Sequence, residues 1–287
     1  MRTQSVDTHP EAERIMIELI RRAPLSKRFR LVQSLTQSTM WSSIHTWQES
    51  HCEASEQEAA VHVFSSSYET NLARRVQEAL EMRAPWQIRP IDLIAVMLPA
   101  LHAFDHLCVP YYLAGSIASS LHGMQQLAQD IDLVVDLPEH TIARLPALLK
   151  PYYVLKDTIQ EAERAHMSFS LIHLDSLMKV DVVLPKQDAF DTSMRQLVAH
   201  HTLDERYPPF LLASACEMIL FKLQRYQQDE RSRTDGMQDD AEWNDILGML
   251  KVQGPDLDLP LLEEWAGTLG MTDTWRRALV DTGLRDA

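Results

Sequence analysis

The sequence has little cysteine, little glycine and no long apolar run. Its three cysteines, Cys52, Cys108 and Cys216, lie far apart and form no C-x-x-C pair, which argues against a disulfide framework and against structural zinc. The eight glycines and the absence of low-complexity tracts argue against extended disorder. Apolar runs such as LIAVMLPAL are far shorter than the roughly 20 residues that cross a bilayer, and the N-terminus lacks the pattern of a secretory signal. We therefore expect a cytoplasmic protein that does not associate with membranes.

Basic charge is also scarce. The chain has 27 Lys and Arg against 41 Asp and Glu, a net charge of −14. Proteins that coat a phosphate backbone are usually basic, because their cations replace the counterions of the nucleic acid. We therefore expect no bulk binding of duplex DNA, while a local contact with RNA or a nucleotide stays open. A length of 287 residues suits about two domains, or one domain with a large helical appendage.

Hydrophobic spacing predicts three regions. Residues 1–88 have apolar residues at helical spacing, no glycine and no acid cluster, so they indicate a helical domain that could bind a protein partner rather than perform chemistry. Residues 89–192 contain short β-rich runs with helical segments between the early ones, which predicts a mixed sheet. Residues 193–287 predict helices again. The expected fold is α+β, with a mixed β-sheet core flanked by N-terminal and C-terminal helical regions.

A glycine interrupts the chain between a predicted strand and a predicted helix, in LAGSIASSLHG. Gly115 would allow a sharp turn and a close approach of the backbone to a ligand. The helix that follows would present N–H groups at its N-terminus, which suit an anion, and Ser116 adds a hydroxyl. This turn can hold phosphate, although tight turns from strand to helix often use glycine without binding anything.

Two acids share one face of the next predicted strand, QDIDLVV. Asp130 and Asp132 are two residues apart, so both side chains point the same way, and each raises the pKa of the other unless a cation lies between them. Mg²⁺ suits such oxygen ligands, with Mn²⁺ as an alternative. A third acid, Asp181, lies in the apolar run KVDVVLP. If the two strands pair, three carboxylates could hold two metal ions bridged by a triphosphate; solvated acids at strand ends are the structural alternative.

Together, LAGSIASSLHG, QDIDLVV and KVDVVLP resemble the nucleotidyltransferase superfamily that includes DNA polymerase beta. More narrowly, the chain is similar to small bacterial nucleotidyltransferase-like proteins related to abortive-infection toxins. Gly115, Ser116, Asp130, Asp132 and Asp181 match the superfamily pattern of Gly-Ser, Asp-x-Asp and a later acid. In the tail, Lys222 and Asp245 match a helical lysine and a later aspartate of the narrower group. The similarity covers about residues 90–285.

The resemblance implies a Mg²⁺-dependent transfer of a nucleoside monophosphate from a nucleoside triphosphate to a hydroxyl of a protein, a tRNA or a small molecule. It implies that Gly115 and Ser116 hold terminal phosphates, and that Asp130, Asp132 and Asp181 are the catalytic residues and metal ligands. Lys222 would neutralise phosphate charge, and Asp245 would position that lysine or the acceptor. It also implies a role in a toxin–antitoxin or defence pair.

One departure from the family pattern supports a different function. Relatives usually carry Pro and Arg in the spacer before the acids, where this chain has Gln125 and Gln126. Loss of a guanidinium weakens binding of phosphate or acceptor. The alternative is therefore a catalytically inactive protein on the same fold that binds a nucleotide or a partner. Tyr226 and Trp243 could stack a nucleobase, although core packing explains them more simply.

Overall fold

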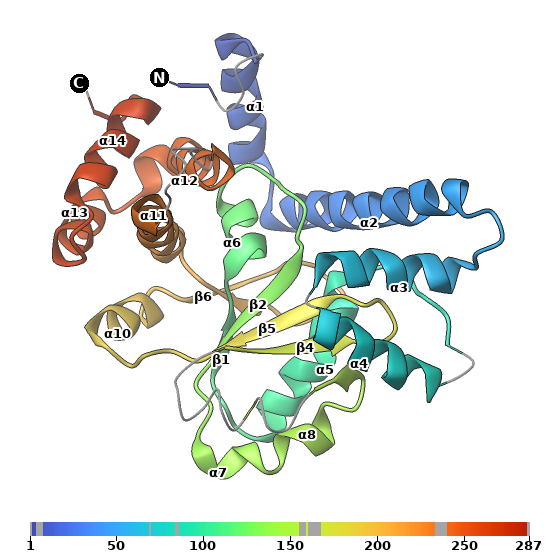
Figure 1. The fold of residues 1–287 in the computed structure, drawn as a ribbon. Helices are drawn as coiled ribbons and strands as arrows, with labels where there is room; N and C mark the ends of the chain where they lie inside the picture. The colour runs from blue at the N-terminus through green and yellow to red at the C-terminus, as the bar shows by residue number, and fades with distance from the viewer. Residues whose placement is uncertain are drawn as a thin grey trace. The chain divides into compact units, whose positions relative to one another are not determined.

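The chain has an α+β fold, as expected, with seven strands and many helices in the part of the chain that the structure describes (Figure 1). Its residues group into two compact units, each made of separate stretches of sequence. Unit 1 comprises residues 1–31, 113–126 and 187–287, and unit 2 comprises residues 32–112 and 127–186. The structure is a computed structural model, and it describes residues 2–3, 8–68, 70–83, 86–154, 159, 168–232 and 240–285.

Unit 2 contains most of the β-sheet. Across the sheet its strands follow the order β3-β4-β5-β2-β1, and β2 pairs with β5 in parallel whereas β4 is antiparallel to both β3 and β5. Buried and part-exposed residues alternate along β2 and β5, as expected for strands with one face in the core. The elements are α3 (Glu56–Ser67), α4 (Thr70–Glu81), α5 (Leu93–His106), β1 (Tyr111–Leu113), β2 (Asp130–Val135), α7 (Glu139–Ile142), α8 (Leu145–Leu148), β3 (Tyr152–Tyr153), β4 (Phe169–His173) and β5 (Lys179–Val183), together with most of α2 (Leu25–Ser50).

Helices α2, α3 and α4 pack together around a core that includes Ile44, Phe64 and Val76, joined by Ile172 and Leu177 from β4 and the turn after it. Helix α3 begins with a capping box, in which Ser55 and Glu58 each bond the backbone of the other. This core places α2 and α3 beside the β4–β5 turn, and residues of all three line one pocket.

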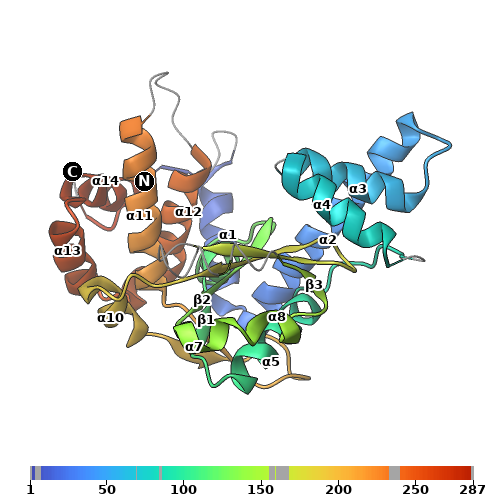
Figure 2. The ribbon, with the colours of Figure 1, turned by 60° about the horizontal axis from the view of Figure 1, so that its bottom comes forward.

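Unit 1 is mainly helical. Figure 2 shows α11, α12, α13 and α14 as one group. The prediction that residues 193–287 contain only helices is wrong in one respect, because β6 and β7 form an antiparallel pair and β7 also pairs with Leu113 of β1. Both strands are too short to show an alternating pattern. The elements are α1 (Pro10–Arg22), α6 (Gly115–His122), α10 (Ala189–Arg195), β6 (Ala199–His201), β7 (Phe210–Leu212), α11 (Ala215–Ser232), α12 (Asp240–Gln253), a 3₁₀ turn (Gly254–Asp256), α13 (Leu259–Thr268) and α14 (Thr272–Thr282).

Helix α1 belongs with the C-terminal helices rather than with α2–α4. Its Glu13 forms a buried ion pair with Lys251 of α12, with 3.0 Å between Oε1 and Nζ. Arg21 Nε donates a hydrogen bond of 3.0 Å to the carbonyl of Val252. The compact units therefore cut across the predicted regions 1–88, 89–192 and 193–287, whose status as domains stays a prediction. Among the helices that the structure describes, none is both long enough and apolar enough to cross a membrane.

Candidate functional site

Three of the predicted site residues lie together on one face of two neighbouring strands of unit 2. Asp130 and Asp132 are on β2, and Asp181 is on β5 directly opposite Asp132 in the parallel register. Neighbouring strands are about 4.8 Å apart, so Asp181 lies within the distance that two bridged metal ions span. The residue opposite Asp130 is Lys179. We call Asp130, Asp132, Asp181 and Lys179 the carboxylate face.

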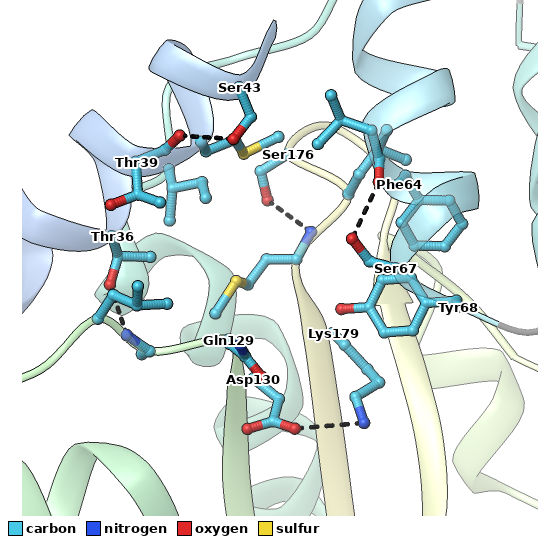
Figure 3. Close-up of a pocket in the computed structure, with 17 residues that line it drawn as sticks. Thr36, Thr39, Ser43, Phe64, Ser67, Tyr68, Gln129, Asp130, Ser176 and Lys179 are labelled. Atoms are coloured by element: carbon cyan, nitrogen blue, oxygen red, sulfur yellow. Dashed lines mark hydrogen bonds and ion pairs between the residues drawn. The ribbon is translucent and has the colours of Figure 1, made fainter. Parts of the chain in front are cut away.

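Lys179 provides the positive charge that compensates this face. Its ammonium lies 2.6 Å from Asp181 Oδ2 and 3.3 Å from Asp130 Oδ2, and Figure 3 shows it reaching toward Asp130. Burial lowers the pKa of Lys179, but its hydrogen bond to Asp181 and the charges of Asp181 and Asp130 outweigh burial and raise the pKa above its usual value. Lys179 is therefore protonated at neutral pH. Ser170 on β4 donates a hydrogen bond of 2.6 Å to Asp181 Oδ1, which fixes that carboxylate further.

The chemistry of the carboxylate face suits Mg²⁺, because hard oxygen donors on adjacent strands are the ligands this ion takes. Within the described ranges of the chain, no three His, Cys, Asp or Glu side chains are already arranged to hold a metal ion. The position between Asp130 and Asp181 is taken by the Lys179 ammonium. A metal ion bound there would therefore replace Lys179 as the compensating charge, and the metal assignment stays a prediction.

The predicted glycine turn is present in unit 1. Gly115 begins α6 and has a φ of +60°, which residues with a Cβ atom rarely adopt. The preceding residue, Ala114, makes no side-chain capping hydrogen bond to the helix. Backbone N–H groups of the first turn of α6, beside the Ser116 hydroxyl, therefore supply the kind of donors that bind an anion.

The other two predicted residues, Lys222 and Asp245, contact each other in unit 1. Lys222 Nζ of α11 lies 2.8 Å from Asp245 Oδ2 and 3.1 Å from Glu242 Oε2, both on α12. Burial lowers the pKa of Lys222, but the charges of Asp245 and Glu242 and their hydrogen bonds outweigh burial and raise it. Gln126, in the spacer before Asp130, donates a hydrogen bond to Asp245 Oδ1. Asp245 therefore orients both Lys222 and the spacer residue.

The structure places two aromatic residues in the core and adds two charged residues to the site. Tyr226 and Trp243 are buried and pack against each other with tilted rings, whose centroids are 4.8 Å apart, so core packing accounts for both. Sequence reasoning missed Lys179 and Glu242. Lys179 could have been found, because residues i and i+2 of a strand share a face and Lys179 precedes Asp181 by two. Glu242 had no comparable pattern.

No protein-family model matches the sequence, and no curated protein matches it. Among solved structures, an antigenic nucleotidyltransferase-like protein from Paracoccidioides brasiliensis is 15% identical, with a TM-score of 0.38 over 64% of this chain and 91% of that chain. The antibiotic-resistance factor ANT(2'')-Ia is 15% identical, with a TM-score of 0.37 over 66% and 94%. Similarity at this level does not assign an activity, which has to come from the residues themselves.

Proposed function

We propose that the protein is a Mg²⁺-dependent nucleotidyltransferase that moves a nucleoside monophosphate from a nucleoside triphosphate to a hydroxyl acceptor. The observation that carries this proposal is the carboxylate face, where Asp132 and Asp181 are direct partners on adjacent parallel strands and Asp130 lies on the same face. Three carboxylates on one face of two adjacent strands offer the oxygen ligands that Mg²⁺ takes, and bound Mg²⁺ is a common means of acting on phosphates.

The proposed roles follow from the resemblance and from the carboxylate face. Asp130, Asp132 and Asp181 would hold the metal, and Asp181, oriented by Ser170, would accept the proton of the acceptor hydroxyl. The hydroxyl oxygen would then bond to the α-phosphorus while the bond to the β-phosphate oxygen breaks and pyrophosphate leaves. Bound Mg²⁺ would neutralise charge on the phosphate oxygens. The N–H groups at Gly115 and Ser116 would donate to terminal phosphates.

Lys222 and Asp245 complete the proposed set. Two acids, Asp245 and Glu242, hold the buried Lys222 in place. Its role of neutralising phosphate charge follows from the resemblance. Following the resemblance, we also propose that the enzyme belongs to a toxin–antitoxin or defence pair. Growth arrest on induced expression, absent for Asp132→Asn, would support this.

A second function is favoured by a specific observation. Lys179 already compensates Asp130 and Asp181 without a metal. Gln126, where the resemblance implies an arginine, carries no charge and donates a hydrogen bond to Asp245. These contacts suit a catalytically inactive protein that binds a nucleotide or a protein partner. The exposed apolar side chains Ile15 and Leu19 of α1 would suit such a partner.

One experiment tests the proposed function. The purified protein is incubated with each α-³²P-labelled nucleoside triphosphate, Mg²⁺ or Mn²⁺ and cell extract, and label on macromolecules and small acceptors is measured. We expect transfer that Asp132→Asn and Asp181→Asn abolish, whereas Glu139→Gln, an exposed acid beyond β2, keeps it. Nucleotide binding without transfer would support the inactive alternative and contradict the proposed enzyme.

A further inference from the structure

A pocket in unit 2 adjoins the carboxylate face. It has a volume of about 540 Å³, which is within the range of small-molecule sites. One wall comes from α2 and α3, in the region where the sequence suggested no chemistry, and the opposite wall comes from the start of β2 and the β4–β5 turn. Asp130 and Lys179 line it, so the pocket shares two residues with the carboxylate face (Figure 3).

The lining combines apolar surface with neutral hydrogen-bonding groups. Phe64 and Tyr68 supply aromatic rings, with centroids 4.6 Å apart. Thr39, Ser43 and Ser67 supply hydroxyls from α2 and α3. The hydroxyls of Ser43 and Ser67 donate to carbonyls of their own helices, at 3.0 Å each, which leaves their oxygens oriented as acceptors.

The charges of the lining restrict the kind of ligand. Among the described residues that line the pocket, Asp130 and Lys179 are the only charged ones, and they pair with each other at 3.3 Å. A polycation would need several carboxylates and a polyanion several cations, so neither fits the interior, and the phosphates of a nucleotide would have to lie outside the pocket. A neutral ligand with a flat ring and several hydrogen-bonding groups does fit, provided that any charged end lies at Asp130 and Lys179.

Tyr68 is held in position for such a ligand. Its ring packs against Phe64, and the Lys179 ammonium lies 5.8 Å from its centroid, within reach of a cation–π contact. Burial raises the pKa of Tyr68 to about 12, so its hydroxyl keeps its proton and can donate a hydrogen bond at neutral pH. Tyr68 therefore joins the aromatic wall to the carboxylate face.

We propose that this pocket binds a nucleoside, with its base against Phe64 and Tyr68, its hydroxyl groups toward α2 and α3, and its phosphate-bearing or reacting end at Asp130 and Lys179. This rests on the proposed function and extends it, because it assigns a substrate class to the pocket. The nucleoside group in the pocket could belong to either of two substrates: the donor nucleoside triphosphate or a nucleoside acceptor. In either case residues 32–68 take part directly in substrate recognition.

Binding to the full-length protein tests the inference. Isothermal titration calorimetry is run with adenosine, guanosine, cytidine and uridine and with the four nucleoside triphosphates, each with Mg²⁺. Thr39→Phe places a ring in the pocket, while Ser34→Phe places the same ring on an exposed position of α2 outside it. Tyr68→Ala removes the stacking ring and Tyr68→Phe keeps it. Thermal unfolding of every variant confirms that it is folded.

We expect at least a tenfold loss of affinity for Thr39→Phe and Tyr68→Ala and less than a twofold change for Ser34→Phe. A loss that includes the triphosphates assigns the pocket to the donor, and a loss confined to nucleosides assigns it to the acceptor. If none of the eight probes binds, or if Thr39→Phe behaves like Ser34→Phe, the inference is overturned. Label transfer that persists in Thr39→Phe would contradict the nucleoside-binding role of the pocket but not the proposed nucleotidyltransferase activity. Binding that depends on the pocket, without any label transfer, would contradict the proposed activity but not the role of the pocket.

Discussion

At the scale of single residues, Lys179 partly neutralises the negative charge of the carboxylate face. Its ammonium lies between Asp130 and Asp181, where a metal ion would compete with it. We predict that Lys179→Met strengthens Mn²⁺ binding several-fold, because the acids lose their internal cation and keep their oxygen ligands. Calorimetric titration with Mn²⁺ measures this, with Lys186→Met, an exposed lysine beyond β5, as the control. Unchanged Mn²⁺ affinity would mean that the metal does not enter between these two acids.

His122 makes the stability of the protein depend on pH. It is buried at the end of α6, and its Nε2 donates a hydrogen bond of 2.8 Å to the Ala213 carbonyl. Burial lowers its pKa from 6.5 to about 4, because removal from water disfavours the charged ring; the hydrogen bond to Ala213 acts in the opposite direction and is outweighed. A lowered pKa means that the unfolded chain takes up a proton first as the pH falls. His122 therefore contributes stability above pH 6.5, and that contribution is lost as the pH falls toward 4.

We predict that acidification from pH 6.5 to pH 4 removes about 3 kcal/mol of unfolding free energy through His122. Urea unfolding at several pH values measures this loss. His122→Gln should reduce the slope of stability against pH across the same interval, since glutamine can donate to Ala213 but does not titrate. His173 and His201 also have lowered pKa values, with burial the largest cause, and they should account for the slope that remains. A slope that is equal in both proteins would contradict the prediction.

At the scale of elements, the start of α6 depends on the backbone at Gly115. Its φ of +60° is unfavourable for any residue with a Cβ atom. We predict that Gly115→Ala lowers the unfolding free energy by about 1–2 kcal/mol, as measured by urea unfolding. Gly267→Ala is the matched control, because Gly267 lies inside α13 and a Cβ there would meet nothing within 4 Å. That change should stabilise by up to about 1 kcal/mol. Equal effects at both sites would contradict the argument from φ.

The elements also show how far sequence reasoning reached. The alternation in QDIDLVV and KVDVVLP predicts two half-buried strands, and the structure pairs them with Asp132 opposite Asp181. This succeeded because one buried face fixes the register of a strand. Strands β6 and β7 were missed because three residues are too few to show a period.

The pocket could not be predicted for a different reason. Its walls come from residues 36–68 and from residues 127–130 and 176–179, which are distant in the sequence. Thr39, Ser43 and Ser67 look like ordinary surface residues of helices, and only packing around the core of unit 2 places them beside Asp130. The pairing of Glu13 with Lys251 was equally hidden, because a single acid in an amphipathic helix indicates a solvated position.

At the scale of the whole molecule, the buried ion pair between Glu13 and Lys251 joins the first helix to α12. Neither side chain is more than 4% exposed. We predict that Lys251→Met alone lowers the unfolding free energy by roughly 3–5 kcal/mol, because it removes the Lys251 charge from the buried Glu13 carboxylate. The double variant Glu13→Leu/Lys251→Met should recover most of that loss, since an apolar pair can replace a buried ion pair. Urea unfolding of both single variants and the double variant measures this coupling. Additive effects would show that the pair is not coupled.

The division of the chain has a consequence for how the protein is made. The polypeptide passes from one unit to the other after residues 31, 112, 126 and 186. Segments of the two units are therefore synthesised alternately. Helix α1 cannot pack against α12 until residues beyond 240 have been synthesised. A shortened gene that starts at codon 89 would remove the first helix of unit 1 and one wall of the pocket together. Loss of activity in such a deletion could result from misfolding or from loss of substrate binding, and the two causes could not be separated. Point substitutions are therefore the better way to assign a role to the N-terminal residues.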